Sequence, residues 1–375
     1  MVKFQSSTLK LDYPVYGSVF LGKHTLLVTG GGGEGNNGIP NKLSVVDINF
    51  DLEKSPLSIS EEVKLADQED APTCIDSSND GTIIFSCNKG SKTIENGEND
   101  HLRRYKFNTN NDEKNSLIFE KSAQISKATD PQEYIKNCCI STKGDFVALS
   151  TSNDNKIFVV NTNDLTEIFQ LIAENAIKDI SISPDDEIIA YSTPSTVKFV
   201  SSESGKFLKD AGEIFKNYTI NKIKFIDNDI ILIAAALKNG NSGIALIKYS
   251  ISQEKILLEK TINKKIKAVT SLAYDKSKKL IGLAGSDTSI ILVNAIDFSV
   301  ITTLSNVHSF AVTSIQFSPD CKYLSSGSAD NSINVFVLPA DIKKGSDISS
   351  MIILTLIMLL AVVIQYILMS NFGKK

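Results

Sequence analysis

The residues that most clearly suggest chemistry form one run near the start of the chain, GGGGEGNNGIPNK, from Gly30 to Lys42. It contains the spacing G-x-G-x-x-G, at Gly30, Gly32 and Gly35. In dinucleotide-binding folds this spacing opens a helix that holds a pyrophosphate. No helix can open here, because Asn37, Gly38 and Pro40 follow, and the next residues, LSVVDIN, form another strand pattern. Lys42 also lacks the preceding Gly and the following Ser or Thr of a phosphate-binding P-loop, so the run predicts no nucleotide site.

The same run can fold tightly, since Gly and Asn accept left-handed backbone angles that other residues avoid. Its carbonyl oxygens could then converge on a cation. Neutral oxygens suit a weakly hydrated monovalent ion better than zinc, whose Cys and His ligands the run lacks. From the residues alone, two readings stay open: a monovalent-cation loop and a flexible glycine-rich turn.

Other reactive side chains form no site. His24, His101 and His308 lie in three separate parts of the chain, with no second ligand or nucleophile at a useful spacing. The five cysteines are odd in number and lie mostly in apolar runs, which indicates buried thiols in a reducing compartment rather than disulfides. A hydrolase or lyase is disfavoured, because the sequence has no cluster of paired acids or histidines.

The elements that must position the glycine-rich run are repeated strands. The clearest unit is Val312 to Leu338, in which VTSIQFSPD precedes KYLSSGSADNS and INVFVL, and Ile177 to Val200 has the same pattern. The last apolar residue of each first strand marks seven units: Phe20, Ile75, Ile140, Ile182, Phe225, Tyr274 and Phe317. Half of the spacings between them are 42 or 43 residues, the length of a four-stranded blade. The sequence predicts an all-β, seven-bladed WD40-like β-propeller with degenerate repeats, since the chain has no tryptophan.

This architecture has two consequences. The seventh unit ends after its third strand, and the alternating segment Phe4 to Leu11 can supply the missing one and close the ring.

In the first blade the glycine-rich run joins the second and third strands. Asp70 lies in a loop between blades, and both kinds of loop emerge on the same face of a propeller. The insert and Asp70 should therefore be neighbours. A second polar insert, Asn88 to Asp100, is expected to be a mobile loop rather than a site.

The end of the chain has a different composition. Met351 to Met369 is a run of 19 residues without a charge, about 28 Å long as a helix, which predicts a C-terminal transmembrane α-helix. The N-terminus has no apolar signal-peptide region, so the main domain is expected to stay cytosolic. The expected organisation is a propeller at 1–340, a juxtamembrane linker at 341–350, the helix at 351–369 and a short lumenal tail at 370–375.

The charge balance excludes one class of partner. There are 39 basic and 43 acidic residues, a net charge of -4, whereas nucleic-acid binding needs a clustered basic excess. We therefore expect no nucleic-acid partner.

Five stretches of the chain carry a resemblance to a known family: YPVYGSVFLGKHTLLVTGGGGEGNNGIPNKLSVVDI, EDAPTCID, HLRRYKF, ILIAAALKNG and HSFAVTSIQFSPD. The chain resembles the yeast endoplasmic-reticulum exchange factors for the small GTPase that starts COPII coat assembly, known in animals as the prolactin regulatory element-binding family. The resemblance covers most of the predicted propeller and includes the terminal anchor. It implies a guanine-nucleotide exchange factor without covalent chemistry and without a directly bound small-molecule substrate. Its partners would be the COPII small GTPase and the endoplasmic-reticulum membrane, in a single-pass type II arrangement.

The resemblance also implies a site. In that family the insert of blade one binds a structural potassium ion, K+, and presents its tip to the GTPase switch region. The potassium loop would comprise Gly31, Gly32, Gly33, Glu34, Gly35, Asn36, Asn37 and Gly38. The tip would be Ile39, Pro40 and Asn41, with Asp70 as a second, acidic contact. The alternative is a membrane-anchored propeller scaffold of the same family without exchange activity. A sister branch of that kind has an altered insert, so the full GGGGEGNNGIPN run favours exchange.

Overall fold

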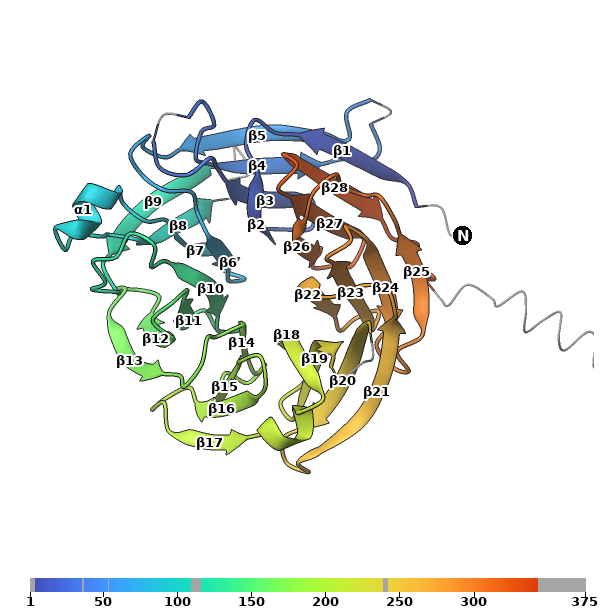
Figure 1. The fold of residues 1–375 in the computed structure, drawn as a ribbon. Coiled ribbons are helices and arrows are strands. Elements are labelled where there is room, and N and C mark those ends of the chain that lie inside the picture. Colours follow the sequence, from blue (N-terminus) through green and yellow to red (C-terminus); the bar gives the residue numbers. More distant parts are fainter. Residues whose placement is uncertain (1–3, 36, 53, 109–115, 239–241, 343–375) are drawn as a thin grey trace, which may run out of the picture.

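A computed structural model of the chain describes residues 4–35, 37–52, 54–108, 116–238 and 242–342. Within them, seven antiparallel four-stranded sheets are arranged in a ring, as Figure 1 shows. The fold expected from the repeats is confirmed. Residues 343–375 lie outside the described residues, and with them most of the predicted linker, the transmembrane helix at 351–369 and the tail. Among the residues that the structure does describe, no helix is long and apolar enough to span a membrane.

Each blade runs from an innermost strand at the centre of the ring to an outermost strand at its rim. Blade one is β2 (Val15–Phe20), β3 (Thr25–Gly30), β4 (Lys42–Ile48) and β5 (Leu57–Lys64). Blade two is β6 (Cys74–Ser77), β7 (Thr82–Ser86), β8 (Leu102–Asn108) and β9 (Ser116–Ala123). Blade three is β10 (Ile135–Ile140), β11 (Phe146–Thr151), β12 (Lys156–Asn161) and β13 (Glu167–Ile172). Blade four is β14 (Asp179–Ile182), β15 (Ile188–Ser192), β16 (Val197–Ser201) and β17 (Phe207–Asp210).

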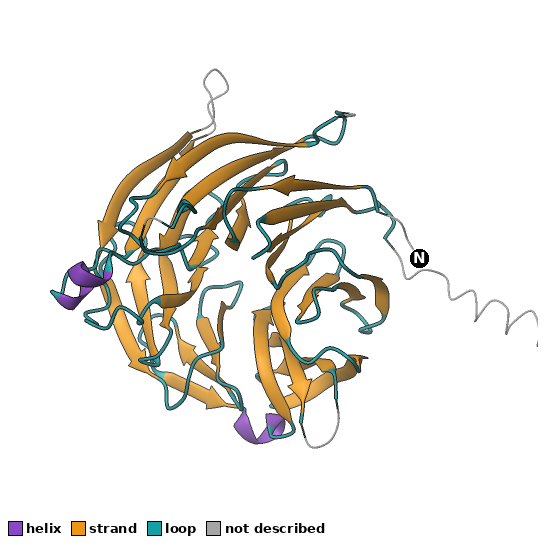
Figure 2. Ribbon diagram, turned by 45° about the horizontal axis from the view of Figure 1, so that its top comes forward, coloured by secondary structure: helices purple, strands orange, loops and turns teal. Residues whose placement is uncertain are grey.

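Blade five is β18 (Tyr218–Phe225), β19 (Ile230–Leu237), β20 (Ile244–Ser250) and β21 (Lys255–Asn263). Blade six is β22 (Val269–Asp275), β23 (Leu280–Gly285), β24 (Ile290–Asn294) and β25 (Val300–Leu304). Blade seven is β26 (Val312–Phe317), β27 (Tyr323–Ser328), β28 (Ser332–Val337) and β1 (Ser6–Lys10). Two short helices complete the described structure, α1 (Ser91–Glu95) and a 3-10 helix (Gly212–Phe215), shown in purple in Figure 2.

The seven marker residues of the sequence pattern all fall in innermost strands. The ring closes through the N-terminal strand, because β1 pairs antiparallel with β28, from Ser6 opposite Phe336 to Lys10 opposite Ser332. This closure is the one that the incomplete seventh unit predicts. It joins the two ends of the propeller in a single sheet, so that β28 is not left as an unpaired edge.

The burial of the strands follows from their place in a blade. A middle strand such as β3 or β7 is covered by the neighbouring blades on both faces and is almost entirely buried. The outermost β5 and β13 have exposed residues along their length. Each apolar cluster lies between two adjacent blades, as where Leu27 and Val45 of blade one pack with Ile83 and Phe85 of blade two. Because the blades support one another in this way, the loops at their ends are carried by a rigid scaffold.

Candidate functional site

The glycine-rich insert, residues 30–42, joins β3 to β4 as the sequence predicts. It lies against the segment that connects blade one to blade two. The Leu65 amide donates to the Asn41 carbonyl oxygen (2.8 Å), and the Gly35 amide donates to the Asp67 carbonyl oxygen (3.1 Å). Gly33 approaches Asp70 so closely that a Cβ on Gly33 would lie 3.2 Å from Asp70 Oδ1. The prediction that the insert and Asp70 are neighbours is confirmed.

Asn41 does not lie at the exposed tip of the insert, and that expectation is wrong. Its side chain is only 4% exposed. Oδ1 accepts from the Gly33 amide (3.1 Å), while Nδ2 donates to the carbonyl oxygens of Gly33 (3.0 Å) and Glu69 (2.8 Å). The insert has no strand partner, so its backbone groups need other acceptors and donors, and an amide side chain can satisfy both at once. Asn41 therefore holds the insert and the segment between the blades together.

Ile39 is the apolar group that the insert does expose, at 39% of its surface. Asn37 fixes the backbone around it. Its Oδ1 accepts from the Ile39 amide (3.0 Å), and its Nδ2 donates to the Gly32 carbonyl oxygen (2.8 Å). Pro40 is half-buried beside it. Glycine is required at Gly31, where a Cβ would lie 2.0 Å from Asn41 Oδ1, and at Gly33, whose φ is +90°.

Tyr16, which lies near Asp70 on this face, is a residue that the sequence reasoning missed. Asp70 is partly exposed, and its Oδ1 accepts from the amide of Ala71 (2.7 Å). Tyr16, at the start of β2, is 38% exposed. Burial and, after it, the nearby Asp70 carboxylate raise the pKa of the Tyr16 hydroxyl. An aromatic residue on the exposed register of an otherwise buried strand was the signal available in the sequence.

A buried network of charged side chains lies next to the insert, and the sequence reasoning missed this network too. Glu69 and Arg103 are 5% and 7% exposed. Arg103 Nη1 donates to Glu69 Oε2 (3.0 Å) and Nη2 to Oε1 (2.5 Å), and Lys89 Nζ donates to Oε1 (3.0 Å). Burial alone would raise the pKa of the Glu69 carboxyl, but the hydrogen bonds and charges of Arg103 and Lys89 outweigh it and lower that pKa. Arg103 within HLRRYKF, on a strand with buried neighbours, was the only sequence signal for a buried partner.

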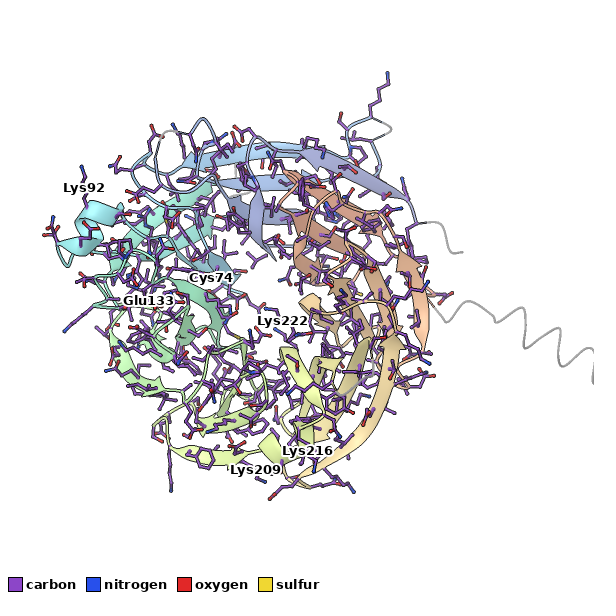
Figure 3. The ribbon with its side chains drawn as sticks, in the orientation of Figure 1. Cys74, Lys92, Glu133, Lys209, Lys216 and Lys222 are labelled. Carbon is purple, nitrogen blue, oxygen red and sulfur yellow. The ribbon has the colours of Figure 1, made fainter. Side chains whose placement is uncertain are left out.

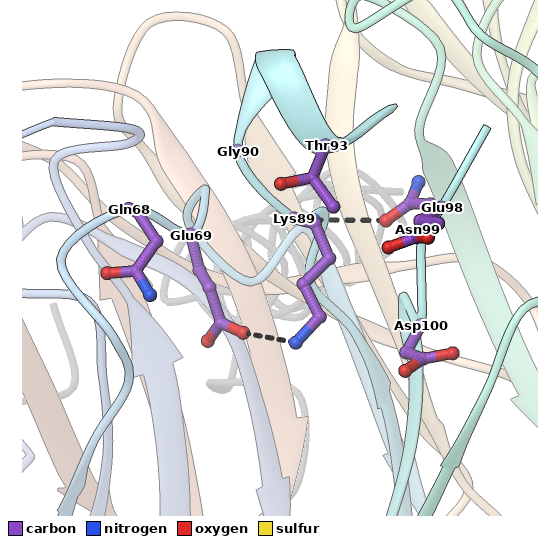
Figure 4. A pocket seen from close by; sticks show the side chains of 8 residues that line it. All are labelled: Gln68, Glu69, Lys89, Gly90, Thr93, Glu98, Asn99 and Asp100. Carbon is purple, nitrogen blue, oxygen red and sulfur yellow. Dashed lines mark hydrogen bonds and ion pairs between the residues drawn. The ribbon is translucent and has the colours of Figure 1, made fainter. Parts of the chain in front are cut away.

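The second insert, residues 88–100, is folded against the first, whereas the sequence predicts a mobile loop there. It contains α1, whose Ile94 is buried. The Glu34 carboxylate of the first insert accepts from the Ser91 amide (Oε1, 2.9 Å) and from Ser91 Oγ. A cavity of about 290 Å³ is lined by Gly90, the residue before Ser91, and Figure 4 shows the side chains that line it. Its lining is Gln68, Glu69, Lys89, Gly90, Thr93, Glu98, Asn99 and Asp100.

The donor set of the insert determines which cation would fit. Across the described part of the chain, no group of three or more His, Cys, Asp and Glu side chains could hold a metal ion. Among the expected ligands, the oxygens of Gly32, Gly33 and Gly35 accept hydrogen bonds within the insert, and Glu34 is turned toward Ser91. In the described structure the carbonyl oxygens of Gly31, Glu34 and Gly38 accept none. Neutral carbonyl oxygens of this kind fit a monovalent cation and not zinc. Asn36 lies outside the described residues.

The histidines have structural surroundings. His101 is buried, with Nδ1 2.8 Å from the Asn99 carbonyl oxygen, and its Nε2 accepts from the Ser126 amide (3.3 Å). Burial lowers its pKa to about 4. His308 is held by Ser326 (2.8 Å) and Ser332 (2.9 Å). These contacts join loops to strands and leave neither ring free to act as a general base.

Residues 298–336 match the family of the WD domain, G-beta repeat. The crystal structure of the WD40 beta propeller domain of Doa1 is similar, with a TM-score of 0.63 over 92% of this chain and 100% of that chain. At 12% identity this similarity shows the fold alone. The molecule is thus a WD40 β-propeller whose loops on one face form the candidate site.

Proteins similar in sequence show to which family of WD40 β-propellers the chain belongs. Guanine nucleotide-exchange factor SEC12 of Candida glabrata is 32% identical over 354 residues, which cover 93% of this chain and 75% of SEC12. The chain belongs to the family of SEC12 guanine nucleotide-exchange factors. It is also similar to SED4 of Candida glabrata, 32% identical over 91% of the chain, and to SED4 of Saccharomyces cerevisiae, 29% identical over 89%. The chain spans only 33% and 31% of the lengths of these two SED4 proteins.

Proposed function

We propose that the chain is a guanine nucleotide-exchange factor for the small GTPase that initiates COPII coat assembly. The observation that carries the proposal is the presentation of Ile39. Its exposed apolar side chain stands on an insert whose backbone is tied down by Asn37 and Asn41, next to the partly exposed Asp70. The similarity to SEC12, a guanine nucleotide-exchange factor, supports exchange as the activity.

An exchange factor must bind the nucleotide-free GTPase better than the loaded form. A 1000-fold preference corresponds to about 4 kcal/mol of differential contact, which a few loop residues can supply. Ile39 would act as an apolar wedge between switch segments that the nucleotide otherwise keeps ordered. Asp70 would offer its carboxylate to the same partner. The Asn41 amide is hydrogen-bonded inside the protein, so Asn41 would act indirectly, by holding Ile39 and Asp70 in fixed positions relative to each other.

The insert would also hold a potassium ion through backbone carbonyl oxygens, such as those of Gly31 and Gly38. A bound cation would supply positive charge that these oxygens share, and this would stiffen the insert. The chain's own contribution is the tight glycine backbone and the Asn37 and Asn41 amides that fold it.

The proposal includes a place of action. A helix at 351–369 would anchor the propeller to the endoplasmic-reticulum membrane, with the propeller on the cytosolic side. The activated GTPase would then be produced next to the bilayer, where an amphipathic helix on it could insert.

The test is release of a fluorescent guanine nucleotide from the GTPase, measured against concentration of the purified full chain. Ile39→Ala and Asp70→Ala should each lower the rate at least tenfold, equal to about 1.4 kcal/mol of lost interaction. Glu203→Ala removes an exposed carboxylate from the turn between β16 and β17, on the opposite face, and should leave the rate unchanged. A wild-type chain that binds the GTPase but releases no nucleotide would instead establish the alternative, a scaffold without exchange activity.

A further inference from the structure

The blade-one insert is held from outside by the second blade. The Glu34 carboxylate receives both the amide and the hydroxyl of Ser91, the first residue of α1. The two segments approach closely at Gly90, where a Cβ would lie 3.2 Å from Glu34 Oε1 and 2.6 Å from the Gln68 carbonyl oxygen. A contact this close leaves the outer part of the insert little freedom to move.

The insert is held from below by the same blade. Asn41 donates to the Glu69 backbone (2.8 Å), and the Glu69 carboxylate is bound by Arg103 of β8 and by Lys89 of the second insert. The Ala66 amide also donates to Glu69 Oε2 (3.3 Å). The segment between blades one and two, which contains Glu69, is thus bound to blade two on one side and to the insert on the other.

Such support is needed because the insert is rich in glycine. Ordering a residue costs roughly 1–2 kcal/mol of backbone entropy, and glycine loses more than other residues. The insert has no strand partner of its own, so contacts from outside must offset this cost. If only a fraction of molecules has the insert in place, the apparent affinity for a partner falls by that fraction.

We propose that Glu34 with Ser91, and Glu69 with Arg103, are positioning residues for nucleotide exchange, through which blade two holds the blade-one insert ready for its partner. This inference rests on the proposed function. It makes the second insert a working part of the site, although Ser91 and Arg103 need not touch the GTPase. Loss of a positioning contact should raise KM and leave kcat almost unchanged, because a saturating partner orders the insert again. Loss of Ile39, a direct contact, should lower kcat.

The test uses the full chain with Glu34→Ala, Ser91→Ala and the double variant, in steady-state exchange assays over a range of GTPase concentration. Glu34→Ala removes both hydrogen bonds to Ser91 and should raise KM at least tenfold, consistent with losing more than one charge-assisted hydrogen bond. Ser91→Ala removes only the hydroxyl donor and leaves the backbone amide in place, so it should raise KM by a smaller factor. The double variant should be no worse than Glu34→Ala alone, since the hydroxyl bond that Ser91→Ala removes is already lost in Glu34→Ala. Glu34→Gln keeps an accepting oxygen and should recover part of the loss.

Two controls lie on the same helix. Glu95→Ala removes an exposed carboxylate that has no side-chain partner in the described structure, and Lys92→Ala removes a side chain that points outward from α1 in Figure 3. Both variants should behave as wild type. Glu69→Gln tests the buried pair of Glu69 and Arg103. Its KM is compared with that of the wild type, provided that circular dichroism shows the same fold.

The outcomes separate the two proposals. A wild-type chain that releases no nucleotide refutes the proposed function itself. An active wild type with unchanged KM in both Glu34→Ala and Ser91→Ala overturns the positioning role. Additive losses in the double variant overturn it too, because Glu34 would then act on the partner independently of Ser91.

Discussion

Replacing Asn41 with alanine should weaken both the fold of the insert and the exchange rate. The side chain is 4% exposed and makes three hydrogen bonds, to both backbone groups of Gly33 and to the Glu69 carbonyl oxygen. Water can reach Gly33, which is partly exposed, but the Glu69 carbonyl group is buried. One buried unsatisfied carbonyl and two weakened bonds amount to roughly 2 kcal/mol. This exceeds the few tenths of a kcal/mol expected for an exposed loop residue.

The measurements are thermal unfolding, hydrogen exchange of the backbone amides in 31–42, and nucleotide release. Asn41→Ala should lose amide protection throughout the insert and slow nucleotide release at least tenfold. Asn41→Asp is nearly isosteric but has no Nδ2 donor, so it should be at least as damaging. Ile39→Ala should slow release with protection and unfolding unchanged. Unaltered protection of the Gly33 amide in Asn41→Ala would refute the reasoning, because that amide would not depend on Asn41.

Three further predictions concern other parts of the molecule. The unfolded chain protonates His101 below pH ~6.5, but the folded chain does so only near about 4. The contribution of neutral His101 to the free energy of unfolding is therefore complete above pH ~6.5. The free energy of unfolding should fall by on the order of 3 kcal/mol as the pH drops to about 4. Urea unfolding measures this change, and a folded His101→Gln variant should show a flatter pH profile. Replacing potassium with sodium or lithium should slow exchange without unfolding the propeller, and equal rates in the three salts would contradict the cation loop. Deleting residues 350–375 should leave a folded propeller that is active in solution, and a folded but inactive product would show that the deleted segment takes part in exchange.

Much of the fold could be predicted because its signals are local. The strand and turn pattern around Ser318 to Asp320 recurs at Ser183 to Asp185, and in both copies the Ser hydroxyl donates to the Asp carboxylate, at 2.8 and 2.6 Å. Such a turn depends only on residues two apart. The count of units and the spare strand Phe4 to Leu11 then led to a closed ring of seven blades. Because loops alternate between the two faces of a blade, the neighbourhood of the insert and Asp70 followed as well.

The interior of the site could not be predicted in this way. Glu34 and Ser91 are 57 residues apart and Glu69 and Arg103 are 34 apart, in segments without a periodic pattern. In such loops a side chain points to whichever backbone or charged group lacks a partner, and those groups are known only once the loops are placed side by side. Asn41 is the clearest case. Its sequence position next to Ile39 and Pro40 suggested an exposed tip, whereas two unpaired groups on Gly33 and one on Glu69 draw its amide inward.

The sequence by itself thus determined the repeat, its closure and the location of the insert, since strand periodicity and turn chemistry act over a few residues. Only the tertiary structure decided which insert residues face a partner and which hold the insert in place. That division depends on hydrogen bonds between segments that meet because blade two packs against blade one. Burial of the shared apolar face of the two blades, Leu27 and Val45 against Ile83 and Phe85, brings those loops together. Only then can Glu34 contact Ser91 and Glu69 contact Arg103.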